Sequence, residues 1–172
     1  MKNIVLIGFM GSGKSSVGRR LAERLHFRFV DTDSLIEERA KRRIREIFED
    51  SGEPVFRALE AKIIAEVSSG EGQIIACGGG AVLNPKNVEV LKSKGILIYL
   101  KTALSAIYER VKNSDERPLL NVPQPKVQIE KLLSRRGKIY EEVADLIVDT
   151  TGLSVEQVVQ RIQRELGEKI TS

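Results

Sequence analysis

The segment from Gly8 to Ser15 carries the most specific chemical signature in this 172-residue chain. It reads Gly-Phe-Met-Gly-Ser-Gly-Lys-Ser and matches the pattern G-x-x-x-x-G-K-[ST], in which backbone N–H groups surround the phosphates of a nucleotide. We expect Lys14 to reach the β- and γ-phosphates and Ser15 to bind the Mg²⁺ ion that bridges them. The predicted nucleotide-binding residues are Gly11, Ser12, Gly13, Lys14, Ser15 and Ser16.

Two carboxylates follow the next apolar run, where Asp31-Thr32-Asp33 comes after Phe29 and Val30. Residues two apart at the end of a strand can point the same way, which would direct both carboxylates toward the γ-phosphate. Asp31 is expected to hold the metal through water, and Asp33 to accept a hydrogen bond from an acceptor hydroxyl and orient it. The alternative is that Asp33 only caps a helix that begins at Ser34.

Three more groups could serve an acceptor molecule. Arg57 and Glu60 lie three apart on a predicted helix and can pair, although a surface ion pair would give the same pattern. Gly78-Gly79-Gly80 follows a third apolar run and predicts either a loose turn or a backbone that approaches a ligand closely. Arg135 and Arg136 precede Tyr140 on another predicted helix, where a solvated basic face is the alternative.

The stretch 113–125 has neither helical nor strand periodicity and holds three of the five prolines. A loop of this length inside a compact domain is typical of a functional lid or a disordered connection, and Arg117 lies in it. We therefore predict a mobile lid over about 112–125.

The elements that must position these residues alternate in type along the chain. Short apolar runs at 4–7, 29–30, 74–76, 96–100 and 146–148 predict five buried strands. Apolar residues three and four apart, such as Val17, Leu21 and Leu25, predict amphipathic helices between them. Asn84 before Pro85 and Ser154 before Gln157 are helix-start signals. The alternation predicts an α/β fold with three α/β/α layers around a five-stranded parallel sheet.

Composition limits the class of protein. The length favours a single domain over 1–172, and the absence of a long apolar run argues against a membrane partner. The only cysteine is Cys77, which fits a reducing cytoplasm and excludes an internal disulfide. The net charge is +4, but the basic run 39–45 carries helical spacing and flanking acids, so we expect a solvated helix face and no nucleic-acid partner.

The motifs together resemble those of the shikimate kinase family, from Ile4 to about Leu166 and in unbroken order. The matching segments are Gly8–Ser15, Asp31–Asp33, Phe56–Glu60, Gly78–Gly80, Arg117–Leu120, and Arg136 with Tyr140. The resemblance implies a P-loop NTPase fold like that of the nucleoside monophosphate kinases, with ATP as co-substrate and Mg²⁺ as cofactor. It places a substrate-binding region at about 32–61, and a monomer is the simplest expectation.

Site roles are carried over from this resemblance residue by residue. It implies that Asp33 holds ring hydroxyls of shikimate, that Arg57 and Arg136 grip its carboxylate, and that Glu60 orients Arg57. Gly79 and Gly80 would offer backbone N–H groups to the substrate, and Gly78 is also predicted to bind it. Lys14, Asp33 and Arg117 would be catalytic, with Arg117 moving in with the lid to neutralise charge on the transferred phosphoryl group. Arg110 and the stretch 149–153 would flank the adenine.

Two other functions fit parts of the pattern. A related kinase of gluconate or of a nucleoside monophosphate would keep the loop and lid but bind another acceptor, and two arginines aimed at one carboxylate argue against it. A nucleotide-binding regulator without turnover would be expected to have lost site residues. The sequence therefore favours transfer of the γ-phosphoryl group of ATP to the 3-hydroxyl of shikimate.

Overall fold

A computed structural model describes residues 1–112 and 122–170 of the chain, with side chains described up to residue 167. Five strands form one sheet, and all the strand pairs are parallel. The strands are β1 (Asn3–Ile7), β2 (Arg28–Asp31), β3 (Gln73–Ala76), β4 (Gly95–Lys101) and β5 (Leu146–Asp149). Each predicted strand is confirmed, and each is one residue longer at one or both ends.

Helices connect the strands. They are α1 (Lys14–Leu25), α2 (Thr32–Ala40), α3 (Ile44–Ser51), α4 (Glu53–Ser68), α5 (Pro85–Lys94), α6 (Leu104–Val111), α7 (Pro125–Val143) and α8 (Val155–Ile170), with a short 3₁₀ helix η1 at Ala81–Leu83. Asn84 caps α5 by accepting from the Lys86 amide, and Ser154 and Gln157 form the predicted capping box at α8. Both predicted helix starts are therefore confirmed.

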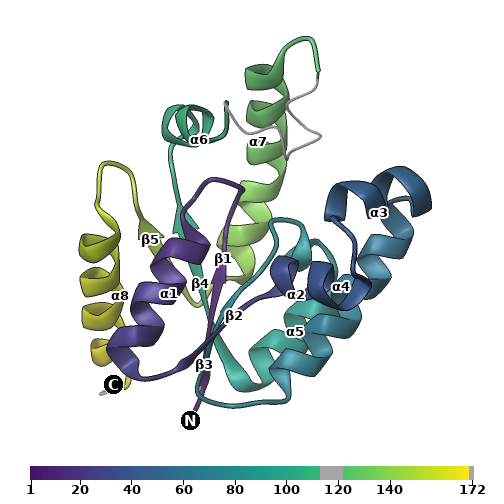
Figure 1. Cartoon of the computed structure of the whole chain (residues 1–172). Coiled ribbons are helices and arrows are strands. Elements are labelled where there is room, and N and C mark those ends of the chain that lie inside the picture. The colour runs from purple at the N-terminus through teal and green to yellow at the C-terminus, as the bar shows by residue number, and fades with distance from the viewer. Residues whose placement is uncertain (113–121, 171–172) are drawn as a thin grey trace.

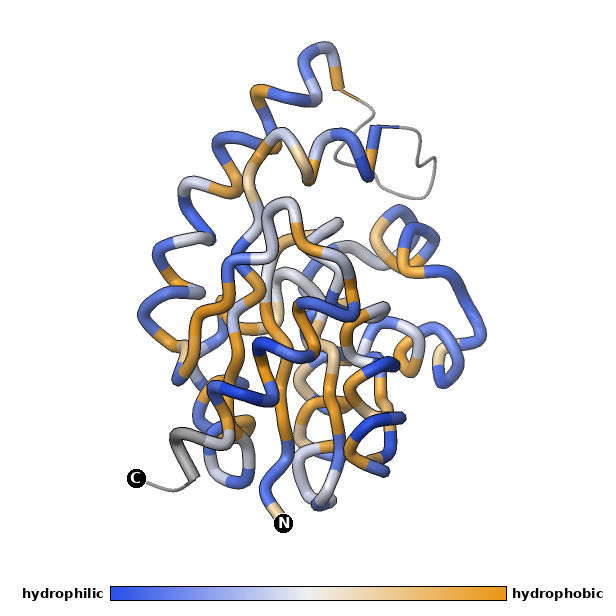
Figure 2. Tube along the Cα trace, turned by 90° about the vertical axis from the view of Figure 1, so that its left-hand side faces the viewer, coloured by the Kyte–Doolittle hydropathy of each residue, from blue (hydrophilic) through white to orange (hydrophobic). Residues whose placement is uncertain are grey.

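The strand order β2-β3-β1-β4-β5 places β1 at the centre of the sheet (Figure 1). Successive side chains of a strand face opposite sides, so the sheet contributes to two cores. Val5 and Ile7 face the side covered by α4, α5 and α7, whereas Ile4 and Leu6 face α1 and α8. The apolar residues accordingly follow the strands through the interior in Figure 2. This confirms the predicted three-layer α/β/α architecture.

Because the strands are parallel, their carboxyl ends meet at one edge of the sheet. The loop after β1, the start of α2 after β2 and the turn after β3 all lie at this edge. The crevice outside the carboxyl ends is the usual ligand site of such folds. The fold therefore gathers the predicted site residues from segments far apart in sequence.

The basic run 39–45 differs from its prediction in one respect. Helix α2 ends at Ala40, Lys41 has a positive φ of 51°, and α3 begins at Ile44. The run therefore forms a turn between two helices and not one helical face. Arg39 pairs with Glu66 and Arg45 with Glu49, at N···O distances of 2.5 and 2.8 Å. The side chains of both pairs are largely exposed, so the expected solvated character is confirmed.

Across the described part of the chain, no helix is both long and apolar enough to cross a bilayer.

Candidate active site

The loop between β1 and α1 depends on glycine. Gly11 and Gly13 have φ values of 72° and 92°, in the left-handed region where side chains other than glycine are strained. Gly13 is the N-cap of α1, and the first turn of the helix holds no acidic residue. The free N–H groups and the positive end of the helix dipole at this terminus favour an anion such as a phosphate.

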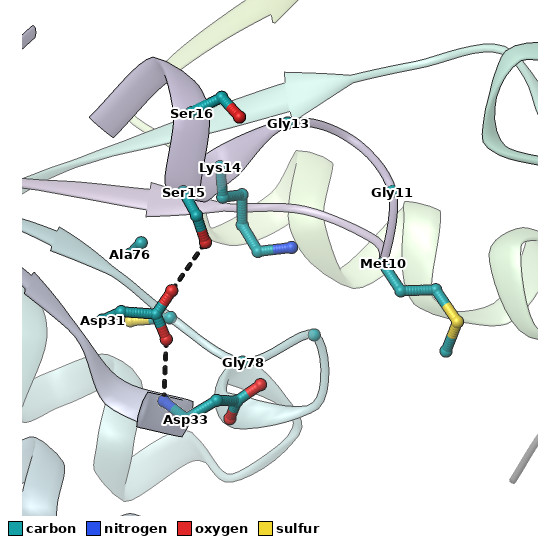
Figure 3. Close-up of a pocket in the computed structure, with 12 residues that line it drawn as sticks. Met10, Gly11, Gly13, Lys14, Ser15, Ser16, Asp31, Asp33, Ala76 and Gly78 are labelled. Atoms are coloured by element: carbon teal, nitrogen blue, oxygen red, sulfur yellow. Dashed lines mark hydrogen bonds between the residues drawn. The ribbon is translucent and has the colours of Figure 1, made fainter. Parts of the chain in front are cut away.

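Lys14 lies along the inside of this loop. Its ammonium group donates to the carbonyl oxygens of Gly8 and Phe9, at 2.8 and 2.9 Å. The side chain extends into the pocket that Figure 3 shows, opposite the carboxylate of Asp33. A positive charge is thus held beside the backbone of the glycine-rich loop.

Asp31 connects this loop to the second half of the pocket. Its Oδ2 accepts from the hydroxyl of Ser15 at 2.6 Å, and its Oδ1 accepts from the Asp33 amide at 3.1 Å (Figure 3). Oδ1 also accepts from the Ser34 amide at 3.2 Å. Asp31 is therefore the N-cap of α2. The alternative in which Asp33 caps a helix from Ser34 is wrong, because α2 starts two residues earlier, at Thr32.

Asp33 lies in the first turn of α2 and not at the strand end where the sequence placed it. It still reaches the same pocket as Asp31. Its carboxylate lies against Gly78, where a β-carbon would come within 2.5 Å of Asp33 Oδ1. A side chain at position 78 would therefore displace this carboxylate from its place against the turn.

The turn Gly78–Gly80 passes close to the carboxylate of Asp33 and to the guanidinium of Arg57. A β-carbon on Gly80 would lie 2.5 Å from Nη1 of Arg57, so this glycine makes room for the guanidinium. The Gly78 amide donates to the hydroxyl of Thr32 at 3.1 Å, and this N–H group is therefore already bound within the protein. The turn thus approaches protein side chains closely, and the close approach of its backbone to a ligand stays a prediction.

Arg57 and Glu60 form the predicted pair. Nη1 of Arg57 donates to Oε1 of Glu60 at 2.8 Å, and Glu53 accepts a second bond from Nε at 3.3 Å. The side chain of Glu60 is only 1% exposed, so this is not a surface ion pair. Burial raises the pKa of the Glu60 carboxyl, and Arg57 only partly offsets that effect.

Arg136 approaches the turn from α7. Its guanidinium lies over the ring of Phe9, 5.9 Å from the centroid, and a β-carbon on Gly79 would be 3.6 Å from its Nη1. One helical turn later, the buried Tyr140 donates its hydroxyl to the carbonyl of Gly79. Arg135 points to solvent, so only the second arginine of the pair belongs to the site.

The residues predicted to flank the adenine, Arg110 and the stretch 149–153, lie near the glycine-rich loop and the start of α6. Nη1 of Arg110, near the end of α6, donates to the Gly11 carbonyl at 2.8 Å. The segment after β5 is tied to the start of α6, since Thr150 bonds to Thr102 and the hydroxyl of Thr151 accepts from the Ala103 amide. Arg117 and most of the predicted lid lie outside the described residues.

One pocket unites most of the predicted residues. Its predicted lining residues are Gly11, Gly13, Lys14, Ser15, Ser16, Asp31, Asp33, Gly78 and Gly79. Gly80 is the last residue of the turn, the side chains of Arg57 and Arg136 lie against Gly80 and Gly79, and Ser12 is buried inside the loop. Arg110 does not line the pocket and contacts the loop from the side of α6.

Sequence reasoning missed the contacts of Thr32 and Tyr140. Nothing in the sequence distinguishes a threonine between two aspartates, because its hydroxyl bond to Gly78 spans 46 residues. Tyr140 did carry a signal: it lies four residues after Arg136, on the same helix face. Cys77 also lines the pocket, but burial raises the pKa of its thiol far above the usual range, which disfavours the reactive thiolate.

Comparison with known proteins agrees with this geometry. The sequence model of the family described as shikimate kinase matches residues 10–167. The shikimate kinase of Thermodesulfovibrio yellowstonii is 45% identical over 165 residues, which cover 96% of this chain and 95% of that relative. Both similarities extend over nearly the whole chain.

Solved structures give the same result. The shikimate kinase from Acinetobacter baumannii in complex with shikimate superposes with a TM-score of 0.95 at 37% identity, covering 98% of this chain and 94% of the other. The shikimate kinase from Aquifex aeolicus gives a TM-score of 0.86 at 37% identity, with 98% of each chain covered. By its sequence, its fold and the residues around its pocket, the chain belongs to the shikimate kinase family.

Proposed function

We propose that the chain transfers the γ-phosphoryl group of ATP to the 3-hydroxyl of shikimate, giving shikimate 3-phosphate and ADP. Membership of the family makes the chain a kinase that uses ATP. The residue roles given below are part of the proposal.

A single observation carries the proposal: one pocket is lined both by the glycine-rich loop, which we assign to the phosphates, and by residues of α2 and the turn after β3, which we assign to the acceptor. Lys14 and Ser15 come from the loop and α1, whereas Asp33 and Gly79 come from α2 and the turn after β3. A phosphoryl donor and an acceptor bound in these halves would be neighbours. Phosphoryl transfer depends chiefly on such positioning and on charge stabilisation.

The acceptor half suits a small carboxylic acid with hydroxyl groups. Arg57 and Arg136 reach consecutive residues of the glycine turn, and a guanidinium can bind a planar carboxylate through two parallel N–H bonds. Asp33 is the matching acceptor for hydroxyl groups. The solved relative from Acinetobacter baumannii was obtained in complex with shikimate, which is such a molecule.

The donor half suits Mg²⁺. Ser15 and Asp31 present adjacent hard oxygen atoms, and Asp31 is fixed by two backbone amides. Oxygen ligands of this kind, with waters completing the shell, are typical of magnesium sites. We propose that Ser15 and Asp31, the latter through water, would hold the ion, which supplies charge neutralisation at the β- and γ-phosphates when bound.

The protein's own part in transfer is to orient and to neutralise. Lys14 would contact the β- and γ-phosphate oxygens, and the N-terminus of α1 would hold the phosphates in place. Asp33 would accept a hydrogen bond from the attacking hydroxyl and direct its oxygen toward the γ-phosphorus. A loose transition state demands little proton abstraction early in the reaction, so orientation is the main role of Asp33. Arg117 stays a prediction as the lid's contribution.

The test is a coupled assay of ADP release with ATP, Mg²⁺ and shikimate, beside wells with gluconate, AMP or no acceptor. We expect turnover with shikimate alone. Arg136→Ala should raise KM for shikimate by about 100-fold, since it leaves the substrate carboxylate one cation short. Arg135→Ala, its exposed neighbour, is the matched control and should behave as the parent chain. Turnover with another acceptor in place of shikimate would overturn the shikimate assignment. No turnover with any of the acceptors would overturn the kinase assignment.

A cytoplasmic location and a monomeric state remain predictions from composition and from the resemblance.

A further inference from the structure

We propose that two buried hydroxyl groups, those of Thr32 and Tyr140, are positioning devices that fix the turn Gly78–Gly80 so that it can bind the acceptor. The inference rests on the proposed function, because it concerns the acceptor half of the same pocket. Neither residue touches the pocket itself; each acts through the backbone of the turn.

Thr32 holds the start of the turn. It is the first residue of α2, its side chain is fully buried, and its Oγ1 accepts the Gly78 amide at 3.1 Å. Its neighbours Asp31 and Asp33 both face the pocket. One short segment therefore sets the position of the turn relative to the metal-binding and hydroxyl-binding carboxylates.

Tyr140 holds the middle of the turn from the opposite side. Its hydroxyl donates to the Gly79 carbonyl, and this hydroxyl and Nη1 of Arg136 both lie 3.6 Å from the position of a β-carbon on Gly79. The ring is fully buried and packs against Tyr99 with a centroid distance of 5.0 Å, so the hydroxyl has little freedom to move. Burial raises the pKa of this hydroxyl above the usual tyrosine range, which keeps it protonated as a donor.

The bond from Tyr140 to the Gly79 carbonyl also fixes the direction of the Gly80 amide, because the two groups belong to the same peptide unit. The Gly79 C=O and the Gly80 N–H belong to one planar trans unit and point in opposite directions. Fixing the carbonyl on Tyr140 therefore aims the Gly80 amide away from α7. Within the described residues, no protein group accepts a hydrogen bond from the amides of Gly79 or Gly80.

The position of the turn also determines the position of the acceptor-side charges. Asp33 lies against Gly78 and the Arg57 guanidinium against Gly80, at distances that leave no room for a β-carbon. The guanidinium of Arg136 and the Tyr140 hydroxyl lie beside the same residue of the turn, Gly79. A turn released from either hydroxyl would therefore disturb the amides and the charged side chains together, while the phosphate loop would stay in place.

The experiment compares Tyr140→Phe and Thr32→Val, which each remove one hydroxyl and keep the shape of the side chain. Two matched controls also remove a buried hydroxyl. Tyr99→Phe affects the other ring of the tyrosine pair, and Ser68→Ala lies at the end of α4, at the opposite edge of the sheet. The measurements are KM for shikimate, KM for ATP, kcat, the Kd for shikimate by calorimetry without nucleotide, and the melting temperature.

We expect KM and Kd for shikimate to rise by about 5- to 20-fold in each of the two variants, the effect of losing one or two hydrogen bonds around a charged group. KM for ATP should stay within about twofold of the parent value, and both controls should bind shikimate as the parent does. The effects of changing two neighbouring residues are not additive. In an Arg136→Ala background, Tyr140→Phe should therefore raise KM for shikimate by a smaller factor than it does in the parent chain.

Unchanged shikimate binding in both folded variants, with the parent active, would overturn the inference and leave the proposed function intact. So would equal losses of ATP and shikimate affinity, because that is the result of a general loss of core packing. If one variant fails to fold, the other decides between these outcomes. A parent chain that neither binds nor phosphorylates shikimate would overturn both the proposed function and this inference.

Discussion

At the scale of single residues, the acceptor half of the pocket depends on a carboxylate that solvent hardly reaches. Glu60 bonds to Arg57 through Oε1, while Oε2 has no hydrogen-bond partner among the described residues. Burial raises its pKa, and the negative charge of Asp33 adds to the effect, against the attraction of Arg57 and Arg136. Glu60 is thus held in its charged form at a cost in stability.

The sign of that cost follows from proton linkage. The folded chain binds the Glu60 proton more tightly than the unfolded chain does, so this group contributes stability that is present below its unfolded pKa and is lost as pH rises through its raised folded pKa. Function requires the opposite state, because only the ionised carboxylate forms a charged bond to Arg57.

We predict that kcat/KM for shikimate falls as pH decreases toward a pKa above the ordinary glutamate value, as Glu60 becomes protonated. Glu60→Gln should raise KM for shikimate about tenfold at neutral pH, the effect of losing a charge-assisted bond. It should also remove this part of the pH profile. The measurement is a pH profile of kcat/KM for both proteins. An identical acid limb in the variant would show that another group, such as Asp33, titrates there.

A second residue-scale prediction concerns Gly80. In Gly80→Ala, the added methyl group would occupy the space of the Arg57 guanidinium, so we expect KM for shikimate to rise by about 100-fold, as on removal of one partner of a buried charged contact. KM for ATP should not change. Gly137→Ala is the control, since a β-carbon there meets nothing within 4 Å. Normal kinetics in Gly80→Ala would mean that Arg57 can bind the acceptor from another position.

Residue chemistry could be predicted where it depends on local sequence and not where it depends on distant contacts. The loop of Lys14 and the pair of Arg57 and Glu60 both follow from short spacings. The exchange of capping roles between Asp31 and Asp33 was missed because either aspartate can serve as an N-cap. In the structure Asp31 is the cap, and its other carboxylate oxygen accepts from Ser15, a bond that spans 16 residues.

At the scale of elements, a glycine in α1, Gly18, allows this helix to pack closely against the sheet. A β-carbon on Gly18 would lie 2.5 Å from the ring of Phe29 in β2 and 3.3 Å from Leu6 in β1. The helix can approach the strands closely only because this side chain is absent. Since α1 also begins with the phosphate-binding residues, its distance from the sheet determines where Lys14 and Ser15 lie.

We predict that Gly18→Ala lowers the free energy of unfolding by about 1–3 kcal/mol, the usual cost of overpacking. Gly137→Ala, in the middle of α7 with open space around it, should instead raise it by about 0.5–1 kcal/mol, because alanine restricts the unfolded chain and favours the helix. Urea denaturation of the two variants measures both changes. A stabilising Gly18→Ala would mean that Phe29 can move aside without loss.

Strands were easier to predict than the corners between helices. Each strand is a short apolar run bounded by polar residues, which is a local signal. The corner at Lys41 carries no glycine or proline, and only its positive φ marks it in the structure. The sequence therefore favoured one continuous helical face there.

At the scale of the whole molecule, the two cores on either side of the sheet contribute to different halves of the pocket. Helix α1 packs with α8 on one side, while α4 and α7, which carry Arg57 and Arg136, lie on the other. The proposed acceptor side chains of Asp33, Arg57 and Arg136 come from α2, α4 and α7, and not from α1. We therefore expect shikimate to bind without nucleotide.

We predict that shikimate alone, at about 100 times its Kd, stabilises the chain by about 2.7 kcal/mol. For a domain of this size that corresponds to a rise in melting temperature of about 5 to 10 °C. Arg136→Ala should lose most of the shift at the same concentration, and Arg135→Ala should keep it. A shift that appears only when a nucleotide is also present would mean that the acceptor half forms after the donor half is filled.

The layers of the fold followed from the alternation of strands and helices, but the order of the strands did not. Every strand reads as a similar apolar run, and pairing depends on contacts between segments that are far apart. Ile4, for example, pairs with both Ile74 and Ile96. Nothing within the run 4–7 specifies these neighbours.

The central place of β1 has a consequence for the synthesis of the chain. β1 is the first strand to leave the ribosome, yet its neighbours β3 and β4 begin only at Gln73 and Gly95. At translation rates of about 5–20 residues per second, roughly 70 residues take about 4 to 14 s to follow. During that time both edges of an apolar strand lack their native neighbours, so the nascent chain presents a segment that chaperones can bind before the phosphate loop can form.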